Sequence, residues 1–281
     1  MLINLLFDLA KLGLFVALAY RLLKAWARHR QPQWSAALAR RHVATLALLT
    51  LTVSAVKVIE DVLAKESGPV DEAVLWFIRT HVSAGLDPLF KAITVSGSAR
   101  ALVSVTVLAC LALWLARRRL ESMLLGGALV AASALVYVLK AVVGRVRPDL
   151  WQADGYWGSS FPSGHTLSVA ALATAAALCV GRLWPRRSTA AMALAMLWIG
   201  AVALSRLVLG VHWPTDVLAA ICLGASMPLL ASLVMDLRSR PACASTQTAA
   251  APMATFKAQR RSLPEPPHHS LEAGPHAKDS T

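Results

Sequence analysis

The chain has 281 residues, of which 57% are hydrophobic and only 15% are charged, and its formal net charge is +13 at pH 7. An ordinary soluble domain is about 45–50% apolar and about 25% charged, so this chain has more apolar residues than a globular core can bury. This composition excludes a disordered or collagen-like chain, and four cysteines are too few for a disulfide scaffold. It indicates a membrane protein.

Seven apolar stretches approach the length of about 20 residues that an α-helix needs to cross a bilayer. They lie at roughly 2–20, 43–63, 100–116, 122–143, 164–181, 189–209 and 215–235. The first is the weakest because it contains Asp8 and Lys11, which are one turn apart and can pair. The sequence therefore predicts an all-α fold, a polytopic bundle of membrane helices.

The distribution of Lys and Arg predicts the topology, because cytoplasmic loops are enriched in these residues. The connections after the first, third, fifth and seventh spans hold the larger share, and Asp and Glu gather in the other set. We therefore expect a multi-pass protein of a bacterial-type inner membrane, with its N-terminus outside and its C-terminus in the cytoplasm. The cations form short clusters between apolar stretches, which argues against nucleic acid as a partner.

Two segments are not expected to span the membrane. Residues 66–97 place apolar side chains at roughly helical spacing, which predicts helices along the outer surface. The C-terminal stretch is rich in Pro and small polar residues without apolar periodicity, which predicts a disordered cytoplasmic tail. Three histidines in that tail, His268, His269 and His276, are weak candidates for metal binding, because histidine tracts without Cys or carboxylate partners are weak evidence for a metal site.

These features divide the chain into three parts. We expect an N-terminal span with a basic cytoplasmic loop, a main transmembrane domain and a tail, with boundaries at 1–42, 43–236 and 237–281. The candidate catalytic and binding residues all lie in the outward connections of the main domain.

A pair of cations stands at the outer end of the fourth predicted span, where Lys140 precedes Arg147 and Pro148. On a helix, residues seven apart project from one face two turns apart. Pro148 disfavours helical conformation at Arg147 and leaves its guanidinium free to turn inward. Cations that flank a span often extend to lipid headgroups. Their position on the side where few cations are expected favours a functional role.

A second motif, Phe161-Pro-Ser163-Gly164-His165-Thr, opens the fifth predicted span. Ser163 is typical of a helix N-cap, and Gly164 lets a ligand approach the backbone closely. Free N–H groups and the positive end of the helix dipole then make an anion site. An ordinary helix cap is the alternative. His165 favours the anion site because it is a titratable proton donor in the first turn.

The third motif connects the sixth and seventh spans and runs from Arg206 to Asp216. Pro214 fits the first position of the seventh helix, which puts Asp216 in its first turn. His212 stands four residues before Asp216, so the carboxylate can hold one imidazole nitrogen and leave the other as a nucleophile. A lone histidine here would be interpreted as packing, whereas the pair favours catalysis.

Together these three motifs resemble the three-part signature of the type 2 phosphatidic acid phosphatase (PAP2) superfamily, which also includes vanadium haloperoxidases and bacterial acid phosphatases. The resemblance covers the last four spans and, loosely, residues 66–100, where Asp71, Asp87 and Gly97 stand in similar places. It implies a six-helix membrane core.

The resemblance also implies roles for the motif residues. His212 would attack phosphorus and form a phosphohistidine, with Asp216 orienting it, while His165 would protonate the leaving oxygen and later activate water. The phosphoryl oxygens would be held by the remaining motif residues, Lys140, Arg147, Ser163, Gly164 and Arg206.

The outward loops contain no carboxylate cluster with metal-ligand spacing, so we expect a metal-independent enzyme without a cofactor. A site at the outer membrane–water boundary suits a lipid phosphate, such as undecaprenyl diphosphate, phosphatidate, phosphatidylglycerophosphate or lipid A. A lipid phosphotransferase, a haloperoxidase and a transporter are the alternatives. A transporter would place its cations near the bilayer midplane. The sequence does not indicate an oligomeric state.

Overall fold

The computed structural model describes residues 2–151 and 158–238, and every regular element in these ranges is helical. Five described helices are long and apolar enough to cross a membrane. They are α3 (His42–Leu63), α7 (Arg119–Val143), α8 (Gly164–Leu183), α9 (Ser188–Val208) and α10 (Pro214–Arg238). The pair α5 (Asp87–Ser96) and α6 (Ala99–Leu115), bent by 40°, is a sixth candidate. The helices predicted from residue 43 onward are confirmed, with ends that differ by a few residues.

The N-terminal part departs from the sequence prediction. The first predicted span lies within α1 (Leu2–Arg30), which continues well past residue 20 and is not among the five helices that meet the length and hydropathy criteria. The basic loop expected after it is largely helical, because α2 (Pro32–Arg40) follows α1 almost directly. Pro32 suits the first helical position, where its missing N–H costs nothing. That α1 crosses the membrane stays a prediction.

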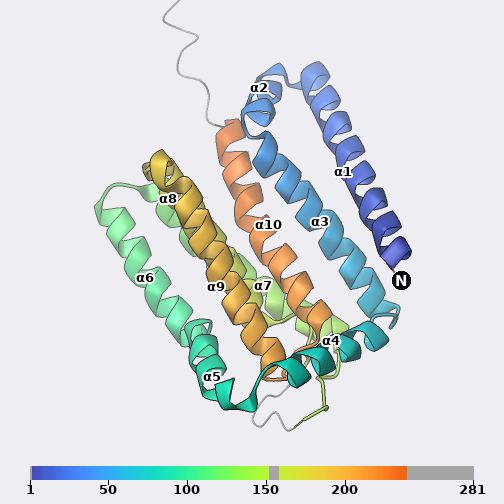
Figure 1. Cartoon of the computed structure of the whole chain (residues 1–281). Helices are drawn as coiled ribbons and strands as arrows, with labels where there is room; N and C mark the ends of the chain where they lie inside the picture. Colours follow the sequence, from blue (N-terminus) through green and yellow to red (C-terminus); the bar gives the residue numbers. More distant parts are fainter. Residues whose placement is uncertain (1, 152–157, 239–281) are drawn as a thin grey trace, which may run out of the picture. The chain divides into compact units, whose positions relative to one another are not determined.

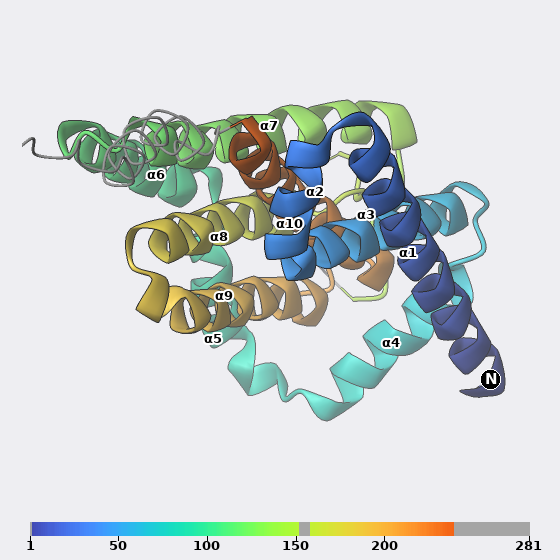
Figure 2. The same cartoon turned by 90° about the horizontal axis from the view of Figure 1, so that it is seen from above.

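Helix α8 is the most buried of the candidate spans and packs against α7, α9 and α10 (Figure 2). Its buried face consists largely of alanines, which let neighbouring helices approach closely. The closest approach is to α10, where a Cβ added to Gly224 would lie 2.4 Å from the carbonyl oxygen of Leu167. This contact packs the first two turns of α8 against the middle of α10.

Helix α4 (Gly68–His81) lies across one end of the bundle (Figure 1). It is followed by η1 (Ala84–Leu86) and α5, so residues 66–97 are largely helical as predicted, although α5 also belongs to the bent candidate span. Its exposed face includes the large apolar side chains of Val70, Trp76 and Phe77. Such a face suits a helix that lies in the interfacial layer of a membrane.

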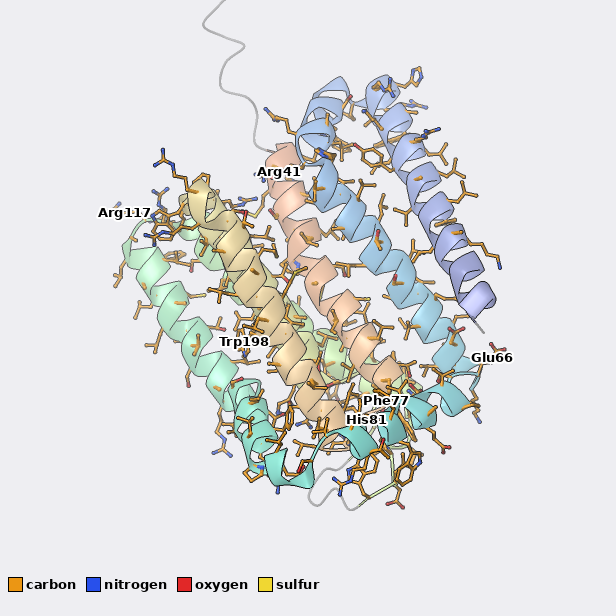
Figure 3. All side chains as sticks on the ribbon, viewed as in Figure 1. Arg41, Glu66, Phe77, His81, Arg117 and Trp198 are labelled. Carbon is orange, nitrogen blue, oxygen red and sulfur yellow. The ribbon has the colours of Figure 1, made fainter. Side chains whose placement is uncertain are left out.

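The two ends of the bundle differ in the residues they carry. Glu66, Phe77 and His81 lie at the end occupied by α4, whereas Arg41 and Arg117 lie at the opposite end (Figure 3). These are the ends that the Lys and Arg distribution assigns to the outside and the cytoplasm, respectively. The predicted tail, with its three histidines, lies outside the described residues apart from its first two residues, which belong to the end of α10.

Candidate active site

The three sequence motifs meet at the end of the bundle that α4 crosses. Helix α7 ends there, α8 begins there, and the connection from α9 to α10 turns there (Figure 1). Antiparallel helices of similar length therefore bring together motifs that are well separated in the sequence.

Lys140 lies in the last turn of α7, and its Nζ donates a hydrogen bond of 2.5 Å to the carbonyl oxygen of Ser159. The helix ends three residues later because Gly144 adopts a left-handed conformation, with φ of 61°. Arg147 therefore stands beyond the helix rather than on its face. This outcome agrees with the effect expected of Pro148 on the preceding residue.

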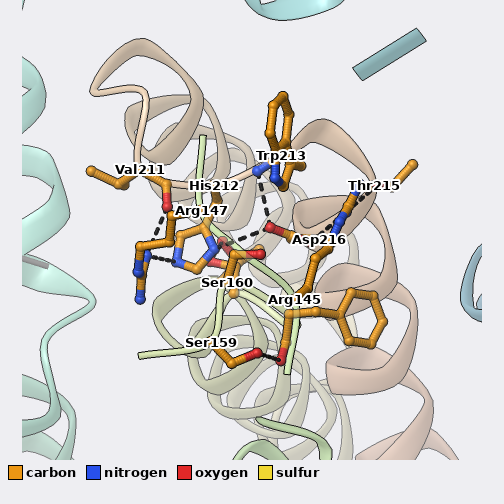
Figure 4. Close-up of polar contacts among 12 residues, drawn as sticks. Arg145, Arg147, Ser159, Ser160, Val211, His212, Trp213, Thr215 and Asp216 are labelled. Carbon is orange, nitrogen blue, oxygen red and sulfur yellow. Dashed lines mark hydrogen bonds and ion pairs between the residues drawn. The ribbon is translucent and has the colours of Figure 1, made fainter. Parts of the chain in front are cut away.

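The guanidinium of Arg147 turns inward, as predicted, and reaches the loop that carries the third motif. Its NH1 donates to the carbonyl oxygen of Val211 at 2.7 Å and lies 3.4 Å from Nε2 of His212 (Figure 4). Its Nε donates to the carbonyl oxygen of Gly158 at 3.2 Å. Arg147 thus places a fixed positive charge beside one ring nitrogen of His212.

Ser163 occupies the N-cap position of α8, but its side chain does not cap the helix. Its hydroxyl instead lies 3.0 Å from Oγ1 of Thr166, and its backbone N–H donates to the carbonyl oxygen of Asp216 at 3.3 Å. Ser163 therefore stands at the predicted N-cap position, but its hydroxyl pairs with Thr166 instead of with a backbone N–H of the helix. The first-turn N–H groups of α8 consequently donate no hydrogen bond to the Ser163 hydroxyl.

His212 and Asp216 form the pair that the sequence predicts. Asp216 lies in the first turn of α10, which begins at Pro214, and its Oδ2 accepts a hydrogen bond of 3.0 Å from the backbone N–H of Trp213. This bond is the half of a capping box in which the third helical residue reaches back to the N-cap. The same Oδ2 lies 3.5 Å from Nδ1 of His212, and both side chains are buried.

Burial lowers the pKa of His212 to about 4, and the charges of Arg206 and Arg147 act in the same direction, while Asp216 opposes them. The imidazole is therefore neutral near pH 7. A neutral imidazole keeps a lone pair on one ring nitrogen, which is the form required of a nucleophile. With Nδ1 facing Asp216, the nitrogen beside Arg147 is Nε2.

Arg206 is almost completely buried in the last turn of α9, and its NH1 donates to Oγ1 of Thr94 on α5 at 2.6 Å. It interacts electrostatically with both His212 and the half-buried His165. The charges of Lys140 and Arg147 also act on His165. The cations predicted from the three motifs therefore act on His165, and two of them, Arg147 and Arg206, also act on His212. Thr94 is a site neighbour that no motif indicated.

Two charged residues that were not assigned to the site also belong to it. Arg145 donates from NH1 to Oδ1 of Asp216 at 2.7 Å and to Oγ1 of Thr215 at 2.8 Å. Its NH2 donates to Oδ2 of Asp71 at 2.6 Å and to Oγ of Ser67 at 3.1 Å. No role was predicted for Arg145 from the sequence. An available signal was its position inside the first motif, two residues before Arg147.

An apolar cavity of about 280 Å³ adjoins His165. Its walls come from α6, α7 and α8, and include Leu102, Leu129, Val136 and Gly164. The cavity thus connects the polar site with the apolar side of the bundle. Within residues 2–151 and 158–238, no group of three or more His, Cys, Asp or Glu side chains is arranged to hold a metal ion.

Comparison with known proteins identifies the family. Residues 121–240 match the model of the PAP2 superfamily. Over 133 residues the chain is 36% identical to decaprenylphosphoryl-5-phosphoribose phosphatase from Mycobacterium tuberculosis, which covers 46% of this chain and 70% of that protein. Over 70 residues it is 47% identical to phosphatidylglycerophosphatase B from Escherichia coli, covering 25% of this chain but only 26% of that protein.

The fold is also similar to a crystal structure of a transmembrane PAP2-type phosphatidylglycerolphosphate phosphatase from Bacillus subtilis. The TM-score is 0.62 at 23% identity, and the match covers 69% of this chain and 98% of that one. The family resemblance predicted from the three motifs is therefore confirmed, and the chain belongs to the PAP2 superfamily of membrane phosphatases.

Proposed function

We propose that this chain is an integral membrane phosphatase that hydrolyses phosphate monoesters or diphosphates of lipids. The observation that carries the proposal is the buried, neutral imidazole of His212, whose Nε2 lies 3.4 Å from NH1 of Arg147. A neutral nucleophile next to fixed cations suits attack on a phosphoryl group, because the cations stabilise the charge on its oxygens.

In the proposed reaction, Nε2 of His212 attacks phosphorus as the ester P–O bond breaks. His165 donates a proton to the departing oxygen, which leaves as the lipid alcohol or lipid monophosphate. His165 then removes a proton from water, and the resulting hydroxide attacks the phosphohistidine. Breaking the P–N bond releases inorganic phosphate and returns His212 to its starting state. Asp216 keeps Nδ1 oriented throughout.

The phosphoryl oxygens have donors on several sides in this arrangement. Lys140, Arg147 and Arg206 supply the positive charge, and the Ser163 hydroxyl and Gly164 N–H add hydrogen bonds at the positive end of α8. We propose that these groups do the work that Mg²⁺ performs in other phosphoryl transfers, so that catalysis needs neither metal nor cofactor.

The apolar cavity beside His165 supports an amphiphilic substrate, whose chain would lie against α6 and α7 while its phosphate meets the cations. The relatives named above act, by their names, on phosphatidylglycerophosphate and decaprenylphosphoryl-5-phosphoribose. We propose a substrate of this class, with phosphatidate and undecaprenyl diphosphate in the same group, and a site that faces the outer side of the membrane.

A substrate panel tests the proposal. The purified protein in detergent micelles should release phosphate from at least one of phosphatidate, phosphatidylglycerophosphate, undecaprenyl diphosphate and lipid A, and His212→Asn should abolish the release. Absence of release from all four by monodisperse, helical protein would overturn the proposal. Bromide oxidation in the presence of vanadate would instead indicate a haloperoxidase.

The proposed orientation has its own test. An impermeant thiol reagent applied to intact cells should label a single cysteine placed at residue 154 but not one placed at residue 250. The reverse labelling would invert the topology.

A further inference from the structure

Arg145 joins two carboxylates that come from opposite parts of the chain. Asp71 lies on α4 and Asp216 on α10, and each accepts a hydrogen bond from a different nitrogen of the same guanidinium (Figure 4 shows the Asp216 side). Thr215 strengthens the link, because its backbone N–H donates to Oδ1 of Asp71 at 2.9 Å and its hydroxyl donates to Oδ2 at 2.7 Å. Asp71 itself lies outside the residues that match the family model.

Because these three side chains are buried, the two carboxylates depend on Arg145 for their counter-charge. Asp71 and Asp216 are fully buried, and the Arg145 side chain is only 16% exposed. Two buried carboxylates near each other repel strongly unless a cation lies between them. The fork of the guanidinium suits this place, because it offers directed donors to both carboxylates at once. Removing Arg145 would leave both carboxylates buried without their shared counter-charge.

The link also determines how the Asp216 carboxylate is turned. Its Oδ1 is taken by Arg145, so its Oδ2 faces the Trp213 N–H and Nδ1 of His212. A carboxylate without the Arg145 bond could rotate about its last side-chain torsion, and His212 would lose a fixed partner for Nδ1. The orientation of His212 therefore depends on a residue that does not contact it.

We propose that Arg145 and Asp71 are positioning residues of the phosphatase reaction. They hold Asp216 so that His212 directs Nδ1 toward the carboxylate and Nε2 toward phosphorus. This inference rests on the proposed function of His212 as the nucleophile. It adds α4, through Asp71, to the elements that assemble the site.

We call the pair of Arg145 and Asp71 the clamp on Asp216. The charges of the three residues explain why the clamp needs both of its members. Asp71, Arg145 and Asp216 together carry one net negative charge. That charge faces the imidazole, which becomes positive as the phosphohistidine forms. In Asp71→Asn, Arg145 would neutralise Asp216 alone, and the stabilisation of the developing positive charge would weaken.

The experiment compares Arg145→Gln, Arg145→Lys and Asp71→Asn with wild type, using nitrophenyl phosphate as substrate and inorganic phosphate as a competitive inhibitor. Phosphate reports on the Lys140, Arg147 and Arg206 cage, which Arg145 does not form. We expect Arg145→Gln to lower kcat about 10–100-fold, by analogy with residues that orient metal ligands through hydrogen bonds. The inhibition constant for phosphate should change less than about twofold. Arg145→Lys and Asp71→Asn should show smaller losses in kcat.

Asp236→Asn is the matched control, because it removes another partly buried ion pair, between Asp236 and Arg182 at 2.9 Å, at the opposite end of the bundle. It should keep the wild-type kcat. A wild-type kcat in Arg145→Gln would overturn the inference. Equal losses of turnover and phosphate binding in Arg145→Gln and Asp236→Asn would also overturn it, because they would indicate a general loss of structure.

A spectroscopic measurement separates this inference from the proposed function. In protein labelled with [¹⁵N]histidine, the His212 signals, assigned by their loss in His212→Asn, should show a protonated Nδ1 and a bare Nε2. Arg145→Gln should give a mixture of the two tautomers. If the wild-type protein releases no nitrophenol, the proposed function fails. The tautomer measurement would still decide whether Arg145 positions His212. An unchanged tautomer in Arg145→Gln would overturn that role.

Discussion

The indole of Trp151 lies directly against the backbone of Gly210. A Cβ added to Gly210 would be 2.4 Å from Nε1 of the indole, and Gly210 has a φ of 64°. Gly210 stands two residues before His212, so the connection after α7 supports the loop that carries the nucleophile. Trp151 is held in turn by α4, through an edge contact with Trp76 and the guanidinium of Arg79 over its ring.

Substitution of Gly210 should therefore impair catalysis more than its backbone strain alone explains. Gly210→Ala forces an alanine into the left-handed backbone conformation, which costs about 1–2 kcal/mol of stability. Its Cβ also displaces Trp151 from the loop that carries His212. We expect kcat to fall at least about tenfold. Gly144→Ala is the control, because Gly144 has nearly the same φ, of 61°, with nothing within 4 Å of the added Cβ. Equal losses in kcat for the two variants would show that Trp151 does not matter.

The two histidines should respond differently to the leaving group. His212→Ala removes the covalent route and should abolish activity on every substrate. His165→Ala should lose about 10²–10⁴-fold on lipid phosphates, whose alkoxide leaving group needs a proton, and far less in the phosphorylation step with nitrophenyl phosphate. A burst of nitrophenol and an acid-labile phosphoprotein should then appear. Equal losses for both variants on both substrates, without a trapped intermediate, would contradict this division of roles.

Removal of metal ions with EDTA and inhibition by vanadate should distinguish a site built from arginine and lysine from one that needs a metal ion. Activity should persist in EDTA, because the charge at the phosphoryl group is proposed to come from arginine and lysine. Vanadate should inhibit, because it can adopt the trigonal-bipyramidal geometry of the transferring phosphoryl group. Initial rates with and without each reagent provide the measurement. Loss of activity in EDTA that Mg²⁺ restores would count against the mechanism.

The stability of the fold should depend on the protonation of His212. Its pKa is lowered from the ordinary value of 6.5 to about 4, so the unfolded chain binds a proton more readily between these values. The free energy of unfolding should therefore fall as the pH drops from about 6.5 to about 4, by roughly 3 kcal/mol at most from this residue. His212→Asn should lower the dependence of Tm on pH in this window. Thermal unfolding in detergent at several pH values tests this, and equal slopes for both proteins would refute it.

The fold could be predicted from sequence largely because a bilayer demands long apolar helices, and Pro214 marks the start of one of them. The His212–Asp216 pair was accessible because its spacing is local. The clamp on Asp216 could not be predicted from the sequence, because Arg145 is separated from its partner Asp71 by 74 positions. No periodicity relates the two residues. Ser163 stands at the N-cap as expected, but the N-cap pattern does not indicate that its hydroxyl pairs with that of Thr166.

The close contact between Gly224 and Leu167 has a consequence for how such a site can diverge. It sets the register between α8 and α10, and the bond from the Ser163 N–H to the Asp216 carbonyl adds to it, so the separation of the two histidines is fixed by helix packing. A relative that keeps this helix packing should therefore inherit the phosphoryl chemistry unchanged, even where other parts of the chain diverge and alter the headgroup preference.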